Sequence, residues 1–246
     1  MRDTVSQKIS VVIPTYNESQ NIVSLIKKIS ETMAESAFTR DRTAEIIVVD
    51  DNSPDGTAAV CQSVGDECCP VRVIIRTDER GLGSAVGRGI QEAAGDTIVV
   101  MDADFSHDCA MIPELALAVN GGPIDVAIAS RFVEGGKMSS SPHLLLGSRM
   151  LNAFLRTVLA LPVRDITGGF IAVRRSSLQD MDSQTIFRGY GDYCIALLYK
   201  GFRRGWRLKE IPFTYSRRQV GLTKTRFLKT GVSYGLRALK LRMGFE

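Results

Sequence analysis

Two aspartates, Asp102 and Asp104, stand two residues apart directly after a short apolar run, and carboxylates at this spacing can hold a metal ion. Side chains alternate along a strand, so residues two apart face the same side. Two carboxylates on one side of a strand end can bind a hard divalent cation, whose open positions then take phosphate oxygens. The pair is a weak signal by itself, because solvated loop carboxylates show the same spacing.

A second acidic segment, residues 50–53 (DDNS), also follows an apolar run. A carboxylate of Asp50 or Asp51 can accept hydrogen bonds from a nucleobase or a ribose. The alternative is a structural role, in which Ser53 or Asp55 caps the N-terminus of a following helix. Both interpretations can hold for different residues of the segment.

Two further segments suit parts of a nucleotide. In residues 14–18 (PTYNE), the ring of Tyr16 can stack on a base and Glu18 can hold a ribose. Residues 80–84 (RGLGS) open a helical pattern with small side chains, so their backbone N–H groups can approach a diphosphate. No single segment identifies a function, and the argument depends on whether the fold brings them together.

The apolar pattern supplies a scaffold that can do this. Runs rich in β-branched residues predict strands at residues 9–13, 46–49, 71–75, 98–101 and 126–129, with Pro14 ending the first. Helical patterns between them cover residues 21–33, 84–94 and 111–119. Apolar strands that alternate with helices indicate a mainly parallel sheet covered on both faces. Ligands bind beyond the carboxyl ends of such strands, which is where residues 14–18, 50–53, 102–104 and 130–131 lie.

The second half of the chain is less regular. It predicts helices over residues 144–161 and 192–199 and a strand over residues 207–215. Residues 165–173 contain a Thr-Gly-Gly turn that leads into another strand, and Asp165 is either a turn carboxylate or one that reaches a sugar hydroxyl. Residues 227–243 space apolar residues helically among basic ones. We therefore expect an α/β domain over residues 1–226 and a basic amphipathic segment over residues 227–246.

Composition narrows the class of protein. The 246 residues, 44% hydrophobic and 24% charged, suit one large soluble globular domain without a secretory signal. The five cysteines show no CxxC spacing, so neither a disulfide framework nor a zinc site is expected. The longest stretch without Asp, Glu, Lys or Arg is eleven residues, 138–148, whereas a membrane-spanning helix needs roughly 20. We expect a chain that does not cross a bilayer.

The net charge of +4 is unevenly distributed. Residues 200–246 hold 13 of the 31 Lys and Arg residues but only 2 of the 27 Asp and Glu residues. Such a region attracts phosphates, nucleic acid or an acidic lipid surface. It lacks a nucleic-acid-binding motif, and the acidic strand ends would repel nucleic-acid phosphates, so we expect no nucleic-acid partner. A helix over residues 227–243 can instead lie in a membrane interface, and residues 144–161 are a second candidate.

In this order and at these spacings, the motifs resemble those of GT-A nucleotide-sugar glycosyltransferases of the inverting family 2 type. Within that family they are most similar to the dolichol-phosphate (polyprenyl-phosphate) mannose synthases. The similarity spans roughly residues 8–230 and is carried by VIPTYNE (12–18), VVDDNSPDGT (48–57), GLGSA (81–85), VMDADFSH (100–107), ASRF (129–132), GSR (147–149), DITGGF (165–170) and RQVGLTK (218–224). The resemblance implies a Rossmann-like GT-A fold and metal-dependent, inverting transfer of mannose from GDP-mannose to a polyprenyl phosphate.

The resemblance also implies a role for each matching residue. The residues that would bind the nucleotide sugar are Pro14, Tyr16, Glu18, Asp50, Asp51, Asp102, Arg218 and Lys224. Asp102 and Asp104 would chelate Mg²⁺ or Mn²⁺, with Ser106 as a further ligand, although some relatives carry Gln at this position. Arg131 and Arg149 would bind the acceptor phosphate and, together with Asp104, would carry catalysis.

The implied chemistry needs no catalytic base. A cation and fixed cationic side chains can stabilise the charge that the leaving diphosphate gains. A phosphomonoester acceptor has a second pKa of about 6, so it is largely dianionic at neutral pH. One alternative keeps this acceptor but uses UDP-glucose or another nucleotide sugar. The other is a transferase acting on a soluble glycan hydroxyl, which would need a base such as Asp165 or Asp192.

The expected partners are GDP-mannose, polyprenyl (dolichyl) phosphate and a membrane surface. Several relatives carry membrane-spanning C-terminal segments that this sequence lacks, so we expect peripheral attachment, by surface binding or through small membrane-anchoring subunits. The expected location is the cytoplasmic face of a membrane, which is the endoplasmic reticulum in a eukaryote and the plasma membrane in a prokaryote.

Overall fold

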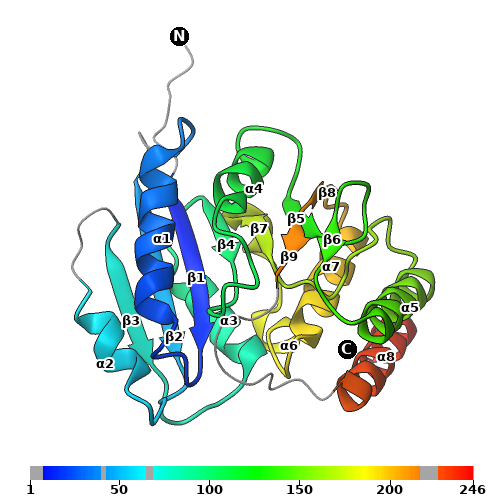
Figure 1. Cartoon of the computed structure of the whole chain (residues 1–246). Helices are drawn as coiled ribbons and strands as arrows, with labels where there is room; N and C mark the ends of the chain where they lie inside the picture. The colour runs from blue at the N-terminus through cyan, green and yellow to red at the C-terminus, as the bar shows by residue number, and fades with distance from the viewer. Residues whose placement is uncertain (1–7, 40–42, 65–68, 217–226, 246) are drawn as a thin grey trace.

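A seven-stranded sheet forms the centre of the structure, a computed structural model that describes residues 8–39, 43–64, 69–216 and 227–245, with the backbone alone for 227–229. The strands lie in the order β3-β2-β1-β4-β7-β5-β8 (Figure 1). Their bounds are β1 Ile9–Thr15, β2 Ala44–Asp50, β3 Val71–Ile75, β4 Thr97–Val100, β5 Val126–Ser130, β7 Ile171–Arg174 and β8 Leu208–Pro212. Every neighbouring pair is parallel except those of β7, which is antiparallel to β4 and β5. The predicted mainly parallel sheet is confirmed.

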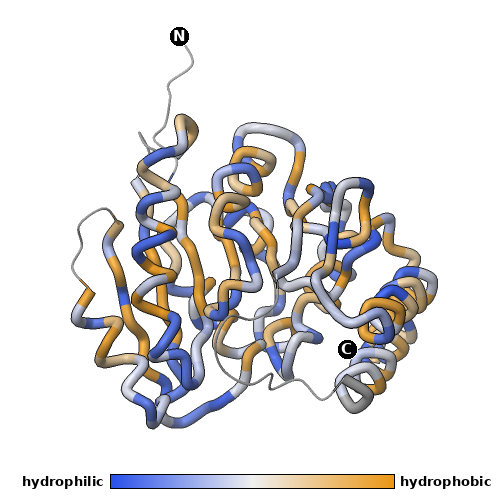
Figure 2. The backbone as a smooth tube through the Cα atoms, viewed as in Figure 1, coloured by the Kyte–Doolittle hydropathy of each residue, from blue (hydrophilic) through white to orange (hydrophobic). Residues whose placement is uncertain are grey.

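Helices cover both faces of this sheet, because successive side chains of a strand point to opposite sides. In β1, Val11 and Ile13 pack with α1 on one face, whereas Val12 packs with α3 on the other. The first face is covered by α1 (Ile22–Glu35), α2 (Thr57–Gln62) and α4 (Met111–Val119). The second is covered by α3 (Leu82–Glu92), α5 (Pro142–Leu159), α7 (Asp192–Arg203) and α8 (Phe227–Met243). Figure 2 shows the hydrophobic strands enclosed between these two layers.

Shorter elements complete the second half of the chain. They are β6 (Lys137–Met138), η1 (Arg175–Leu178), α6 (Ser183–Ile186) and β9 (Thr214–Tyr215). The predicted strand over residues 207–215 breaks at Phe213, after which β9 leaves the main sheet and pairs with β6. This break carries Tyr215 away from the sheet edge.

Most predicted elements match the structure within two residues, but the first strand does not end before Pro14. β1 continues through Pro14 to Thr15 while it pairs with β2. Its pairing with β4 stops at Val12. Pro14 therefore lies beyond the β4 ladder, where its missing N–H interrupts no strand hydrogen bond.

The C-terminal helix is part of the packed structure. α8 lies along α5 and also contacts α7. Its inner face buries Tyr234, Ala238 and Leu241 in the same core as α3 and α7. Among the residues that the structure describes, no helix combines the length and the hydropathy needed to span a membrane.

Candidate active site

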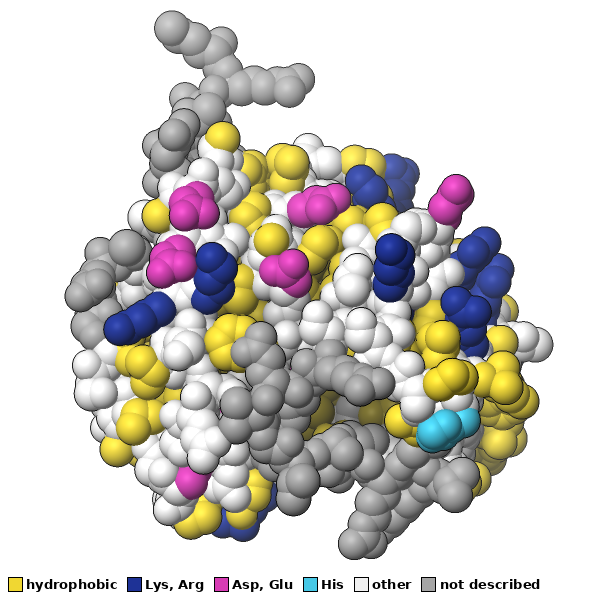
Figure 3. All heavy atoms as spheres, viewed as in Figure 1, with side chains coloured by type: hydrophobic (Ala, Val, Ile, Leu, Met, Phe, Trp, Pro, Cys, Tyr) yellow, Lys and Arg dark blue, Asp and Glu magenta, His cyan; other side chains and the backbone are white. Residues whose placement is uncertain are grey.

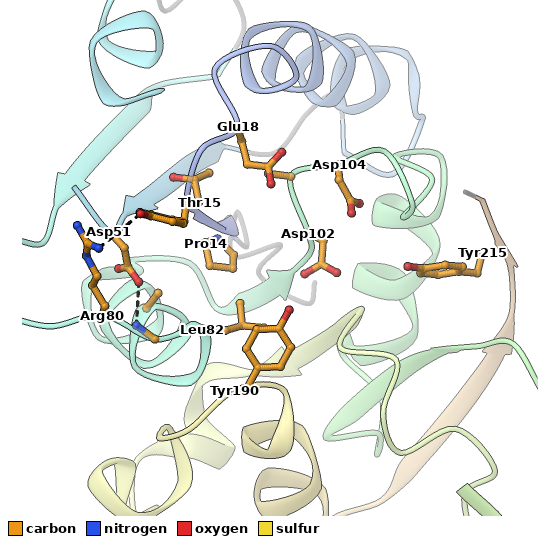
Figure 4. A pocket seen from close by; sticks show the side chains of 14 residues that line it. Pro14, Thr15, Glu18, Asp51, Arg80, Leu82, Asp102, Asp104, Tyr190 and Tyr215 are labelled. Atoms are coloured by element: carbon orange, nitrogen blue, oxygen red, sulfur yellow. Dashed lines mark hydrogen bonds between the residues drawn. The ribbon is translucent and has the colours of Figure 1, made fainter. Parts of the chain in front are cut away.

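A cavity of about 400 Å³ opens where β1, β2 and β4 end, which is the edge at which parallel sheets bind ligands (Figure 4). Its lining includes six of the predicted site residues, Pro14, Tyr16, Glu18, Asp51, Asp102 and Asp104. The start of α3 closes a second side, and Tyr190 and Tyr215 close a third. Segments more than 80 residues apart in the chain thus meet in one place.

The two aspartates after β4 fit a divalent cation. Both line the cavity, and the side chain of Asp102 is 44% exposed. Figure 4 shows them directed into the same space as Glu18. Within the described residues no group of three or more His, Cys, Asp or Glu side chains could hold a metal by itself. A cation here would therefore take two carboxylates from the protein and its other ligands from substrate phosphates and water, which is how Mg²⁺ is commonly bound.

Ser106 lies apart from this pair, so the geometry does not favour its expected role as a metal ligand, which stays a prediction. Its side chain is fully buried and does not line the cavity. The cause is Phe105, whose positive φ of 61° turns the chain back beneath the loop. The backbone N–H of Ser106 instead donates to Oδ1 of Asp104 at 3.0 Å. Ser106 therefore stabilises the turn of the loop and does not contribute to the lining of the cavity.

The side chains of Asp50 and Asp51 lie in different environments, and only that of Asp51 lines the cavity. Asp50 is fully buried, accepts the hydroxyls of Thr15 and Ser53 at 2.9 and 2.6 Å, and is absent from the cavity lining. These bonds join the loops after β1 and β2, and the expected contact between this carboxylate and a nucleoside stays a prediction that the geometry does not favour. Asp51 does line the cavity, and its Oδ2 accepts the backbone N–H of Gly81 at 2.8 Å.

Arg76, at the end of β3, is a residue that the sequence interpretation missed. It is buried, and its Nε donates to Oδ1 of Asp51 at 2.7 Å. Its Nη1 donates to the Ser84 hydroxyl at 2.9 Å and its Nη2 to the carbonyl of Gly81 at 3.0 Å. Arg76 thereby fixes the start of α3 against the end of β2. The signal was available, because Arg76 follows the predicted strand over residues 71–75.

The glycines at the start of α3 allow close packing against residues 188–189. The N–H of Gly81 donates to Asp51, and the N–H of Gly83 donates to the carbonyl of Gly189 at 3.1 Å. A Cβ on Gly83 would lie 2.6 Å from the carbonyl oxygen of Arg188, so only glycine allows this approach. These two N–H groups are therefore engaged inside the protein, whereas the predicted approach of the backbone of residues 80–84 to a diphosphate stays a prediction. The close approach also places Tyr190 at the cavity.

A second cavity of about 500 Å³ adjoins the first and contains Arg131. The Arg131 guanidinium is buried and pairs with both oxygens of Asp165 at 2.7 Å. Burial would lower the pKa of Arg131, but the adjacent Asp165 carboxylate outweighs it and raises that pKa. Nη2 also donates to the Thr167 hydroxyl, whereas Nη1 makes no hydrogen bond within the described residues. The fixed Arg131 guanidinium can therefore donate hydrogen bonds from Nη1 to a ligand.

Neither aspartate considered as a base lines either cavity. Asp165 is fully buried and holds Arg131, which identifies it as a structural turn carboxylate. Asp192 is also buried, accepts the backbone N–H of Tyr190 at 2.8 Å and lies 3.9 Å from Nη1 of Arg237. Both carboxylates are committed to partners inside the protein.

The two cavities adjoin, and one is acidic whereas the other contains a buried arginine. This arrangement agrees with the glycosyltransferase that the sequence motifs imply. The sequence profile described as glycosyl transferase family 2 matches residues 10–182. The chain belongs to this family. Its fold and its catalytic class, a glycosyltransferase, are therefore as the sequence predicted.

Curated relatives of this glycosyltransferase extend over most of the chain. A dolichol-phosphate mannosyltransferase of Pyrococcus furiosus is 39% identical over 88% of this chain, although the match spans only 59% of the relative's length. A dolichol-phosphate mannosyltransferase of Mycosarcoma maydis is 34% identical over 87% of this chain and 72% of the relative. A polyprenol monophosphomannose synthase of Mycolicibacterium smegmatis is 33% identical over 89% of this chain and 81% of the relative.

A solved structure shows that the fold is shared. Glucosyl-3-phosphoglycerate synthase from Mycobacterium tuberculosis, in complex with Mn²⁺, UDP and glucosyl-3-phosphoglycerate, superposes with a TM-score of 0.72. The match covers 97% of this glycosyltransferase and 80% of that chain at 23% sequence identity.

Of the three remaining predicted cationic residues, the structure describes only Arg149. Arg149 is exposed on α5 and lines neither cavity. The reason is helical phase, because Leu144, Ser148 and Leu151 form the cavity face of α5 and Arg149 points about 100° away from Ser148. The geometry therefore does not favour its expected contact with the acceptor phosphate, which stays a prediction. Arg218 and Lys224 lie outside the residues that the structure describes.

Tyr190 and Tyr215 are further site residues that the sequence interpretation missed. Together with Leu82 and Asp102 they line both cavities and so form the boundary between them. Burial raises the pKa of the Tyr215 phenol; the Ser106 hydroxyl opposes this shift, and the carboxylates of Asp102 and Asp104 add to it. No motif marks either tyrosine, because each reaches the site through a turn, at Gly189 or after Phe213, that the sequence pattern does not reveal.

Proposed function

We propose that this glycosyltransferase transfers mannose from GDP-mannose to the phosphate of dolichol or another polyprenol, with inversion and with Mg²⁺ or Mn²⁺ bound by Asp102 and Asp104. The observation that carries the proposal is the junction of two cavities at Asp102. One presents carboxylates for a cation and a nucleotide sugar, and the other presents the buried guanidinium of Arg131 for an anion. The names of the curated relatives support mannose as the transferred sugar and a polyprenyl phosphate as the acceptor.

The first cavity suits the donor. A bound cation would stabilise the charge that the leaving diphosphate gains. The ring of Tyr16, with the Arg80 guanidinium 5.1 Å from its centroid, offers a flat surface for a base. Glu18, held by an N–H bond from its backbone to Thr57, presents a carboxylate to ribose hydroxyls. Arg218 and Lys224 are proposed to cover the donor, as their place in the family motif implies.

The second cavity suits a phosphate on a lipid. Arg131 can hold the acceptor phosphate through Nη1 while Asp165 fixes the rest of the guanidinium. The apolar side chains of Met138, Leu144 and Leu151 line the same cavity and can contact the first isoprene units. An acceptor entering from this side approaches the sugar from the face away from the donor cavity, which favours direct displacement and hence inversion.

Neither of the two candidate bases lines a cavity, which favours a phosphate acceptor over a hydroxyl acceptor. An alcohol loses its proton during transfer and needs a group to take it. Both candidate bases, Asp165 and Asp192, are bonded inside the protein. A phosphomonoester with a second pKa of about 6 needs no such group near neutral pH. The soluble-glycan alternative is therefore the weaker one.

Substrate specificity can be tested with a panel of nucleotide sugars and a short polyprenyl phosphate. With Mg²⁺ or Mn²⁺ present, GDP-mannose should give a β-linked lipid-phosphate mannose, and UDP-glucose should react at least about tenfold more slowly, the equivalent of about 1.4 kcal/mol. Chelation of the cation should abolish transfer. Product formed from UDP-glucose alone would overturn the donor assignment and leave the acceptor standing. Transfer from GDP-mannose to an added soluble glycan, and not to the polyprenyl phosphate, would overturn the acceptor assignment.

We also propose that α5 and α8 lie on the cytoplasmic surface of a membrane. Each exposes a stripe of large apolar side chains, Leu146, Met150 and Phe154 on α5 and Val232, Leu236, Leu239 and Met243 on α8. The stripes adjoin, since a Cβ on Gly235 would lie 3.5 Å from the Phe154 ring. Figure 3 shows hydrophobic side chains gathered at this end of the molecule. Exposed Arg149, Arg156, Lys240 and Arg242 flank the stripes and can face anionic headgroups.

Leu236→Glu should weaken binding to anionic phospholipid vesicles by at least about tenfold, because it replaces an exposed apolar side chain, which would be buried in the membrane interface, with a charge that this interface repels. Co-sedimentation at low salt measures the effect. Leu117→Glu is the matched control, since Leu117 is similarly exposed (54% against 56%) but lies on α4. Equal binding by the two variants, or no binding of the unaltered protein, would count against a membrane surface. Small anchoring subunits would then be the remaining partners for this face.

A further inference from the structure

A fully buried histidine, His107, lies next to Asp102 and has no assigned role in the proposed mannosyl transfer. Its Nδ1 accepts the backbone N–H of Asp102 at 3.0 Å. A ring nitrogen that accepts a hydrogen bond carries no proton, so the neutral ring has its hydrogen on Nε2. That Nε2 is buried and has no hydrogen-bond partner within the described residues.

The unpartnered Nε2 faces the carboxylate of Asp102. It lies 3.8 Å from Oδ2, which is just beyond hydrogen-bond distance. The ring itself is fixed, because it stacks on Phe170 with centroids 4.6 Å apart and meets the rings of Phe213 and Tyr215 edge-on. Asp102 is 44% exposed at its side chain, so the carboxylate is the group that can move to close the gap.

The loop that carries the two aspartates is built around this contact. The chain reverses at Phe105, the residue with a φ of 61°, and this turn returns His107 to a position below Asp102. A non-glycine residue in this conformation is strained and persists only where the surroundings hold it. The bond from the Ser106 N–H to Asp104 closes the same turn.

We propose that His107 is a positioning residue for Asp102, which it holds at two points. Nδ1 fixes the Asp102 backbone, and the Nε2 hydrogen is placed to bond Oδ2 of the Asp102 carboxylate and so to direct the other oxygen into the cavity. This inference rests on the proposed function in one respect, that Asp102 is a cation ligand. Hydrogen bonds to ligating carboxylates commonly set their orientation and their affinity for the metal.

Two substitutions separate the two ends of the ring. Asparagine places its amide oxygen near the position of Nδ1 and has nothing at Nε2, whereas glutamine can place an amide N–H near Nε2. His107→Asn should therefore weaken Mn²⁺ binding by about 10- to 100-fold, and His107→Gln should restore much of it. His107→Phe keeps the stacked ring without either nitrogen and should bind as weakly as the asparagine variant. Electron paramagnetic resonance of free Mn²⁺, with GDP present, measures the affinity without any turnover.

The control is His143→Asn, at the exposed histidine near the start of α5, which should bind Mn²⁺ as the unaltered protein does. Thermal unfolding without metal checks the fold of each variant. Unchanged Mn²⁺ affinity in the phenylalanine and asparagine variants would overturn the proposal for His107 while leaving the proposed function intact. Equal loss in the asparagine and glutamine variants would assign the effect to ring packing and also overturn it. Failure of the unaltered protein to bind Mn²⁺ would instead count against the metal-dependent function.

Discussion

Asp104→Asn is expected to lower the rate of sugar transfer by about 10³-fold, because it removes one of the two charges that would hold the cation at the leaving diphosphate. The variant should fold normally. Oδ1 of Asp104 accepts the Ser106 N–H, and the amide oxygen of asparagine can accept the same bond. Steady-state turnover with GDP-mannose and a short polyprenyl phosphate measures the loss, and higher Mn²⁺ concentrations should restore part of it.

Asp108→Asn provides a close control for this prediction. Asp108 lies on the same loop, is exposed, and accepts the backbone N–H of Ala110 at 3.0 Å, just as Asp104 accepts that of Ser106. The substitution is chemically identical but lies outside the cavity lining, so turnover should stay within about twofold of the unaltered enzyme. A comparable loss in both variants would show that loop shape, not a cation charge, accounts for the effect at Asp104.

Much of the fold and part of the site could be predicted because they depend on local periodicity. Apolar β-branched runs located the core strands, and their carboxyl ends located the cavity that contains Glu18, Asp51 and Asp102. The rule required only that the strands be parallel, and β7, the antiparallel exception, does not interrupt the edge formed by β1, β2 and β4. The family motifs then added the chemistry.

The expectations that the geometry does not favour share a physical cause, which is that spacing along the chain does not report side-chain direction outside a strand. Ser106 follows Asp104 at the same spacing as Asp104 follows Asp102, but the turn at Phe105 buries it. Arg149 adjoins Ser148 in sequence but lies on another face of α5. Tyr190 and Tyr215 reach the boundary of the cavities only through tertiary packing.

Arg131 depends on a partner that local sequence does not reveal either, since Asp165 lies 34 residues away. A buried ion pair contributes little to stability on average, because desolvation of both charges offsets their attraction. The Arg131–Asp165 ion pair instead fixes the orientation of the guanidinium. Asp165 occupies Nε and Nη2, so the guanidinium has one orientation and presents Nη1 to the second cavity.

Arg131→Lys is accordingly expected to lower kcat/KM for the polyprenyl phosphate by about 10²-fold while leaving GDP-mannose affinity unchanged. Lysine keeps the charge opposite Asp165, which avoids the unpaired buried carboxylate that alanine would create at a cost of about 3–5 kcal/mol. Its single ammonium group cannot bond both Asp165 oxygens and an acceptor phosphate in the same fork. Titration of the lipid acceptor at saturating donor, with nucleotide binding measured separately, checks both parts.

The companion variant Asp165→Asn distinguishes this positioning role from base catalysis. If Asp165 only holds Arg131, the asparagine variant should resemble Arg131→Lys, with weaker acceptor binding and a lower unfolding temperature. Its pH–rate profile should keep the shape of the unaltered enzyme, because no proton passes through a carboxylate that lies outside both cavities. Loss of turnover with unchanged acceptor affinity and an altered pH profile would indicate a base, and with it a hydroxyl rather than a phosphate as the acceptor.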